Sequence, residues 1–144
     1  METPQTEFSI IVDTDPARLD RDAIFEFLSQ SYWAKGITRE IVERSIQNSL
    51  CFGAYAWDKQ VGFARVVTDF ATFAYLADVF VLESFRGRGI GRKMLAAVLA
   101  HPQLQGLRRW LLATRDAHGI YSQFGFVPLK APGRFMEIHR PYQD

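Results

Sequence analysis

The sequence contains a single cysteine and no apolar run that reaches the length of a membrane span. One cysteine, Cys51, cannot form an internal disulfide and supplies too few thiolates for a cysteine-rich zinc site. It lies in the apolar stretch SLCFGAYAW, which favours a small buried strand residue over a reactive thiol. A membrane span needs about 18 apolar residues, and the first residues, METPQTEF, lack the basic start and apolar stretch of a signal peptide. We therefore expect a cytoplasmic protein with no membrane partner.

An excess of charge of either sign is also missing, since 17 basic residues face 16 acidic ones and the net charge is +1. The net charge of the chain therefore gives no argument for nucleic acid or an acidic membrane surface as the partner. His101 and His139 form no metal-ligand spacing with carboxylates, so we expect no metal site. A chain of 144 residues with 48% hydrophobic content suits one domain, over residues 1–144, with one sizeable core.

The order of the apolar patterns predicts an α/β protein. Apolar residues recur at helical spacing in three stretches and run almost continuously in several shorter ones. The predicted elements are a strand over 8–13, helices over 20–30 and 38–46, hairpin strands over 50–57 and 61–68, a strand over 74–82, a helix over 90–100, a strand over 109–114, a short helix over 116–124, and closing strands over 126–129 and 134–140. This order predicts a mixed sheet with helices on its faces.

The segment ESFRGRGIGRKM, residues 83–94, places three glycines and four cations between a predicted strand and a predicted helix. Glycines there let successive backbone N–H groups point at one anion, which the helix N-terminus also favours. Cations in the first turn oppose the helix dipole unless an anion lies beside them. The segment therefore predicts a polyphosphate site; the alternative is an exposed arginine-rich turn whose glycines only provide positive φ.

Two common phosphate motifs do not fit this segment. Counted from Gly87, the last glycine of a dinucleotide-binding G-x-G-x-x-G would fall on Arg92. The nucleotide P-loop requires a lysine and a hydroxyl residue after its last glycine, whereas Gly91 is followed by Arg92 and Lys93. Both classes of nucleotide site are therefore disfavoured.

The stretch from Arg86 to Gly91 reads R-x-x-G-x-G, which resembles the signature of the GCN5-related N-acetyltransferase (GNAT) family. A second stretch, IYSQFGF over 120–126, is similar to the family's pattern of tyrosine, two residues, an apolar residue, glycine and phenylalanine. The resemblance covers nearly the whole chain. It implies the α/β GNAT-like acyl-CoA N-acyltransferase fold, with a mixed, mostly antiparallel central sheet that has a V-shaped splay and is flanked by helices. It also implies acetyl-CoA as the cosubstrate.

In this family the strand before the phosphate loop runs beside the pantetheine arm, and the loop holds the pyrophosphate through backbone N–H groups. A backbone N–H of the strand would also polarise the thioester carbonyl and stabilise the oxyanion. Carried over to this sequence, the acetyl-CoA-binding residues are Val79, Phe80, Val81, Arg86, Gly87, Arg88, Gly89, Ile90, Gly91 and Arg92.

Two residues are candidates for the proton transfers of amine acetylation. An amine with the pKa of lysine is neutral in only about one part in 10³ to 10⁴ at pH 7, so something must accept its proton. Asp78 is the only charge in the run AYLADVFVL and could act as this base, could bind the substrate ammonium, or could be satisfied by a neighbouring arginine. Tyr121 occupies the position where the family often places a tyrosine that protonates the departing thiolate; the alternative is a packing role.

The acceptor would enter opposite coenzyme A, over the segments SQSYWAKGI and VVTDFATFAY. Four aromatic residues and one carboxylate there are candidates for binding a small amine: Tyr32, Trp33, Phe70, Phe73 and Asp69. Aromatic residues usually belong to the core, which is the alternative interpretation.

We therefore predict an N-acetyltransferase that transfers the acetyl group of acetyl-CoA to the amine of a small molecule by direct attack. The alternatives are an acyl-CoA binding or sensing module without turnover and a protein or peptide N-acetyltransferase. Nucleic-acid binding through RGRGIGRK and LRRW is a more distant interpretation. Homodimers are frequent in the family, so a homodimer is a further expectation.

Overall fold

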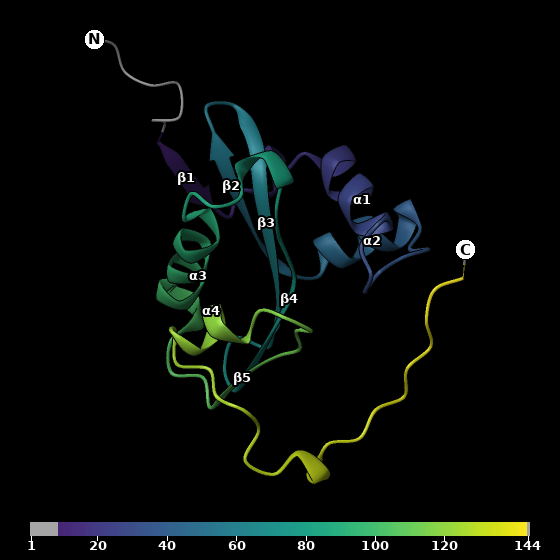
Figure 1. Ribbon diagram of the computed structural model, residues 1–144, viewed down its shortest axis with the longest axis vertical. Helices are drawn as coiled ribbons and strands as arrows, with labels where there is room; N and C mark the ends of the chain where they lie inside the picture. Colours follow the sequence, from purple (N-terminus) through teal and green to yellow (C-terminus); the bar gives the residue numbers. More distant parts are fainter. Residues whose placement is uncertain (1–8, 144) are drawn as a thin grey trace.

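The computed structural model describes residues 9–143, in which five strands form one sheet in the order β1-β2-β3-β4-β5 (Figure 1). The strands are β1 (Ile10–Asp13), β2 (Leu50–Ala56), β3 (Lys59–Thr68), β4 (Phe73–Val81) and β5 (Arg109–Leu112). The first four pair antiparallel, and β5 lies parallel to β4. The mixed, mostly antiparallel sheet is confirmed. Phe8, where the first strand was predicted to begin, lies outside the described residues.

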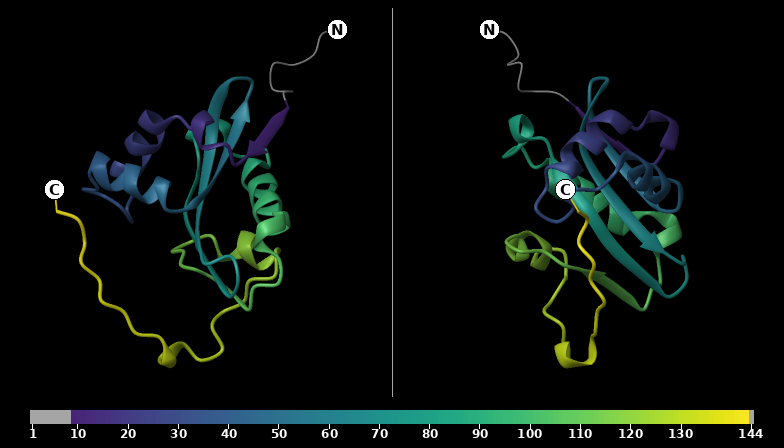
Figure 2. Two further views of the ribbon diagram at one scale, coloured as in Figure 1. Left: turned by 180° about the vertical axis from the view of Figure 1, so that it is seen from behind. Right: turned by 90° about the vertical axis from the view of Figure 1, so that its right-hand side faces the viewer.

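Helices cover both faces of this sheet (Figure 2). The helices are α1 (Arg21–Ser29), α2 (Arg39–Gln47), α3 (Ile90–Ala100) and α4 (His118–Ser122). Short 3-10 turns occur at Pro16–Arg18, Glu83–Phe85, Pro102–Leu104 and Pro132–Arg134. Helices α1 and α2 lie on one face and α3 lies on the other, so the molecule has three layers.

The predicted starts of α1 and α2 are confirmed by their caps. The Ala23 N–H donates to Asp20 Oδ1 at 3.0 Å, and the Ile41 N–H donates to Thr38 Oγ1 at 3.2 Å. These bonds satisfy backbone donors that have no partner within a helix. Apolar residues at helical spacing then face the sheet.

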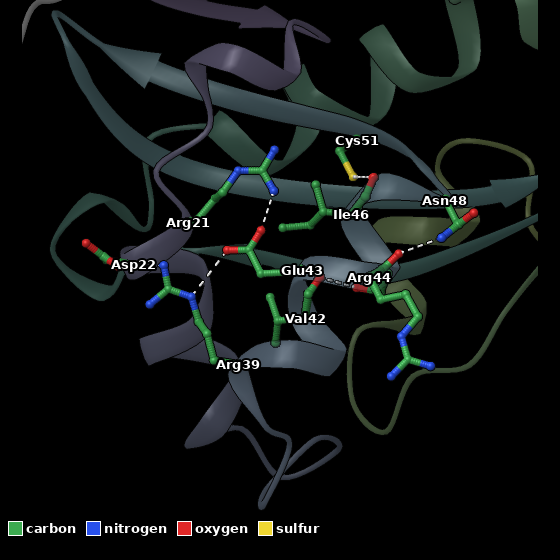
Figure 3. A network of polar contacts seen from close by, with 10 residues as sticks. Arg21, Asp22, Arg39, Val42, Glu43, Arg44, Ile46, Asn48 and Cys51 are labelled. Carbon is green, nitrogen blue, oxygen red and sulfur yellow. Dashed lines mark hydrogen bonds and ion pairs between the residues drawn. The ribbon is translucent and has the colours of Figure 1, made fainter.

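Ion pairs join α1 to α2 (Figure 3). Glu43 Oε1 lies 2.6 Å from Arg21 Nη1, and Glu43 Oε2 lies 3.3 Å from Arg39 Nε. Arg39 also contacts Asp22 at 2.8 Å. The hydrogen bond from Arg21 is the largest cause of the lowered pKa of the Glu43 carboxyl. This stabilisation is therefore present at neutral pH and is lost as the pH falls through that lowered pKa.

The core has two parts, one on each face of the sheet. Buried side chains between the sheet and α1 and α2, from both layers, include Ile24, Leu28, Val42, Ile46, Phe63 and Phe80. Buried side chains between the sheet and α3, again from both layers, include Phe52, Ala64, Val66, Met94, Leu95 and Val98. Burial of apolar area on both faces stabilises the sheet between the helices.

The prediction of closing strands over 126–129 and 134–140 is wrong for this chain. Among the described residues neither segment pairs with a strand, and β5 ends the sheet. Residues 126–143, here called the C-terminal arm, instead run away from β5 in a wide arc to the side of α1 and α2 (Figure 1). A strand needs a hydrogen-bonded neighbour, and the course of the arm provides none.

We predict that Cys51 is unreactive in the folded protein. The side chain is buried in β2, as expected from the sequence, and burial raises the pKa of its thiol to about 11. Because the thiolate is the reactive form, labelling of the folded protein by a thiol reagent at pH 8 should be at least about 10²-fold slower than labelling of the unfolded chain. Similar rates for the two states would contradict the buried position.

Candidate active site

The parallel strands β4 and β5 separate part of the way along β4. They pair only from Phe73 with Arg109 to Leu76 with Leu112, although β4 continues to Val81. A pocket of about 560 Å³, here called the splay pocket, opens where they part. Its lining includes residues 76–79 of β4 and residues 112–117, which are the last residue of β5 and the segment after it. This is the V-shaped splay that the family resemblance implied.

A bulge in β4 lies at the splay. Phe63 pairs with Phe80 and Arg65 pairs with Ala77, so β4 has one more residue than β3 over this interval. Asp78 lies in the extra length and has a φ of 55°, in the left-handed region that non-glycine residues rarely adopt. Bulges bend a strand and redirect side chains, and Asp78 lines the splay pocket.

The Asp78 carboxylate has a partner for each oxygen. Arg65 Nε donates to Oδ2 at 2.8 Å, and the Trp33 indole Nε1 donates to Oδ1 at 2.9 Å. The Asp78 side chain is only 10% exposed and that of Arg65 19%. The ion pair corresponds to the third of the roles considered for Asp78, and it leaves lone pairs free for a ligand. Sequence reasoning missed Arg65, which a lone charge in the apolar stretch VGFARVVT could have revealed.

Tyr121 of α4 also lines the splay pocket, from beyond the end of β5. Its ring packs edge-on against Phe126 with the centroids 5.9 Å apart. Burial, with a smaller contribution from Tyr32, raises the pKa of the Tyr121 phenol above its ordinary value. The hydroxyl is therefore protonated at neutral pH and available as a hydrogen-bond donor.

Tyr32 and Trp33, two of the predicted acceptor residues, lie in the loop between α1 and α2 and form an aromatic wall of the pocket. Their rings meet edge-on with centroids 5.1 Å apart. The guanidinium of Arg115 lies 3.8 Å from the centroid of the Tyr32 ring, and the backbone N–H of Arg115 donates to the Tyr32 hydroxyl at 3.3 Å. These contacts connect the wall to the segment after β5. Nothing in the sequence indicated Arg115.

Three other predicted acceptor residues, Asp69, Phe70 and Phe73, lie at the opposite end of β4, and none of them lines the splay pocket. The Asp69 carboxylate accepts hydrogen bonds from the backbone of Ala71, Thr72 and Phe73 and from the Thr72 hydroxyl. These bonds hold the pKa of Asp69 well below its usual range. Asp69 therefore stabilises the β3–β4 turn.

The glycine segment follows β4 and leads into α3. Gly87 and Gly89 have φ of 80° and 79°, which favours glycine, and a Cβ added at either position or at Gly91 would meet nothing within 4 Å. Gly89 is the N-cap of α3 and provides no side-chain hydrogen bond to the first turn. The backbone at the start of α3 is therefore open to an anion such as a phosphate.

Some of the cations of this segment are held by nearby groups. Arg86 Nε donates to the Val81 carbonyl at 3.1 Å, and the guanidinium of Arg88 lies 5.5 Å from the centroid of the Phe85 ring. Arg92 donates to the side-chain oxygen of Gln123, which directly follows α4. The start of α3 is thus connected to the helix that carries Tyr121. Gln123 was missed because its partner lies in a different element.

The three residues of β4 that were predicted to bind acetyl-CoA have different surroundings. Val79 lines the splay pocket. The Phe80 side chain is buried and stacks on Phe27 with the ring centroids 3.9 Å apart, so only its backbone is available to a ligand. Val81 packs on the α3 side of the sheet.

Residues 9–143 contain neither a cluster of metal-ligating side chains nor a membrane-spanning helix. No group of three or more histidine, cysteine, aspartate or glutamate side chains could hold a metal ion. Over the same residues no helix is long and apolar enough to span a bilayer.

Residues 47–128 match the profile of the acetyltransferase (GNAT) domain family. The chain therefore belongs to the GNAT acetyltransferase family, and its fold is the acyl-CoA N-acyltransferase fold of that family. A candidate acetyltransferase of the fungus Gibberella zeae is 34% identical, over 82% of this chain and 78% of the fungal protein.

Solved structures agree with this assignment. The crystal structure of a GNAT-family protein from Xanthomonas campestris pv. campestris is 51% identical, with a TM-score of 0.90 over 92% of this chain and 94% of that chain. A candidate acetyltransferase of Clostridium acetobutylicum, solved with acetyl-CoA, has a TM-score of 0.65 at 14% identity, over 92% of this chain and 96% of that chain. The second likeness shows the fold alone.

Proposed function

We propose that the protein is a single-domain N-acetyltransferase that transfers the acetyl group of acetyl-CoA to the amine of a small molecule by direct attack. The observation that carries the proposal is the splay pocket, which has Tyr121 on one wall and Asp78 on the strand that leads into the glycine segment. A pocket of about 560 Å³ with an aromatic wall suits a small acceptor better than a long polypeptide.

The residues present fit acetyl-CoA. The open backbone from Gly87 to Gly91 at the start of α3 would hold the diphosphate, with the cations of the segment around it. The backbone of residues 79–81 has no strand on the β5 side among the described residues, so its polar groups could pair with the amides of the pantetheine arm. Acetyl-CoA supplies the thioester that the amine attacks. The Clostridium protein of the same fold, solved with acetyl-CoA, supports this assignment.

Each of the two residues on the pocket walls would then have a role. The phenol of Tyr121 donates its proton to the departing thiolate. Because its pKa is raised, this phenol is protonated at neutral pH. Asp78, held by Arg65 and Trp33, orients the acceptor by accepting a hydrogen bond from its nitrogen. The amine proton then leaves to water in the open pocket.

The phosphate site is tested by Gly89→Asp. The new carboxylate would face the diphosphate and strain a residue with a φ of 79°, so the Kd for acetyl-CoA measured by calorimetry should rise at least about tenfold. Gly106→Asp is the matched control, because Gly106 has a φ of 78°, equally open surroundings and a position outside the segment. Equal affinity losses in both variants, or no saturable binding by the wild type, would overturn the assignment.

Turnover is tested by Tyr121→Phe. Loss of the proton donor should lower kcat about 10²-fold with little change in the Kd for acetyl-CoA, measured by thiol release with a panel of amines. Because the pKa of Tyr121 is raised, ionisation of this phenol should cause no decrease in wild-type kcat between pH 7 and its ordinary value of 10.0. Tyr75→Phe, which alters another tyrosine of the pocket, should retain activity. Thiol release that is absent in the wild type would instead indicate a binding module.

The acceptor role of Asp78 is tested by Asp78→Asn. A neutral amide binds an ammonium or amine more weakly, so KM for the amine should rise about tenfold while KM for acetyl-CoA stays unchanged. Asp116→Asn is the control, since Asp116 lines the same pocket but is 71% exposed and pairs with its neighbour Arg115. A lower kcat with loss of the acidic limb of the pH profile, at constant KM, would identify Asp78 as a base instead.

A further inference from the structure

The segment after β5 carries a cation, Arg115, that the proposed mechanism does not use. Its guanidinium lies 3.8 Å from the centroid of the Tyr32 ring, and its backbone N–H donates to the Tyr32 hydroxyl at 3.3 Å. At this distance the guanidinium lies flat on the ring, because an edge-on guanidinium would push a nitrogen into it. Arg115 is therefore attached to the aromatic wall of the splay pocket through both its backbone and its side chain.

The donors of Arg115 are available to a ligand. Stacking on a ring occupies the flat face of a guanidinium and leaves the N–H groups around its edge accessible. The neighbouring acid Asp116 places Oδ2 at 3.7 Å from Arg115 Nη2, which is longer than a hydrogen bond. The two side chains are 63% and 71% exposed, so this ion pair contributes little. An anionic group in the pocket would therefore compete easily with Asp116.

A charge of the opposite sign lies on the neighbouring ring of the same wall. Trp33 donates to the Asp78 carboxylate at 2.9 Å. The centroid of the Trp33 ring is 5.1 Å from that of Tyr32, which carries Arg115. Adjacent rings thus hold one carboxylate and one guanidinium, and all four residues line the splay pocket. A ligand that lies along the wall meets an anion at one end and a cation at the other.

The charges of the pocket favour a carboxylate as the ligand's anionic group. Of the two arginines in the described lining, Arg65 is bound through Nε to Asp78 and through Nη1 to the Ser49 hydroxyl. Arg115 then matches one negative charge, whereas a doubly charged phosphate would leave one charge without a partner. The planar fork of a guanidinium also matches the two oxygens of a carboxylate.

We propose that the acceptor is an amino carboxylic acid, whose nitrogen is held by Asp78 and whose carboxylate is held by Arg115. This inference rests on the proposed acetyl transfer and names the class of its acceptor. The amine nitrogen bonds to the acetyl carbon while the C–S bond of the thioester breaks. Tyr121 gives its proton to the thiolate, and the amine proton leaves to water. The carboxylate is unchanged, so Arg115 determines specificity and takes no part in the chemistry.

The acceptor class is tested by thiol release with matched pairs of amines. The pairs are alanine, β-alanine and γ-aminobutyric acid, each with its primary amide, which has a similar shape without the charge. For the best acid, Arg115→Gln should lower the acid-to-amide ratio of kcat/KM at least about tenfold relative to the wild type, because a charge-assisted hydrogen bond is lost. Comparing two enzymes on one pair cancels the different basicity of the two amines. Arg115→Lys should retain part of the ratio, because it keeps the charge without the fork.

Arg44→Gln is the matched control. The Arg44 side chain is 66% exposed, lies 3.8 Å from the acid Glu40 and is outside the lining of the splay pocket. Arg44→Gln therefore removes the same charge from a similar environment and should keep the wild-type ratio. An unchanged ratio in Arg115→Gln, or an equal decrease in Arg44→Gln, would contradict the inference and leave the proposed function intact.

Binding provides a second measurement that does not require turnover. The Kd of the best acid for the protein saturated with coenzyme A, measured by calorimetry, should rise at least about tenfold in Arg115→Gln. A wild type that binds the acids but releases thiol with no amine would refute the proposed function alone. A wild type that acetylates other amines but neither binds nor acetylates the acids would refute the acceptor class alone.

Discussion

The separation of β4 from β5 beyond Leu76 and Leu112 is the constraint on which the rest of the structure depends. Parallel pairing requires two backbones in step. The bulge at Asp78 bends β4 while β5 ends, so pairing cannot continue. Backbone groups that a regular sheet would use internally are thereby left beside a pocket. β4 then ends shortly before the glycine segment. The unpaired backbone of β4 therefore leads directly to the backbone that is open to an anion.

The bulge depends on contacts among three elements. Arg65 from β3 and Trp33 from the α1–α2 loop both bind the Asp78 carboxylate. Removing one member of a largely buried ion pair leaves the other charge without compensation, which is costly. The carboxylate of Asp78, whose backbone has a positive φ, therefore also fixes the position of Trp33 in the aromatic wall. The same three residues therefore support the bulged backbone and line the candidate active site.

Much of the fold could be predicted from the sequence, and less of the site. Asp20 and Thr38 indicated the starts of two helices, and apolar runs indicated all five strands of the sheet. The prediction of closing strands over 126–129 and 134–140 was wrong. A segment with strand-forming residues becomes a strand only where the course of the chain brings it beside a sheet edge. Arg65 was missed although it is the only charge in the apolar stretch VGFARVVT, because the sequence does not show which side chain it contacts. Arg115 was missed because nothing in the sequence marked it.

The sequence by itself determined the local features: the helix caps, the strand and helix periodicities, and the glycines with positive φ before α3. These depend on interactions within a few residues, so the order of residue types suffices to specify them. Only the tertiary structure decided that Asp78 meets Arg65, 13 positions away, and Trp33, 45 positions away. Such meetings follow from strand register, a bulge and the splay, which arise when whole layers pack together and have no counterpart in a local pattern.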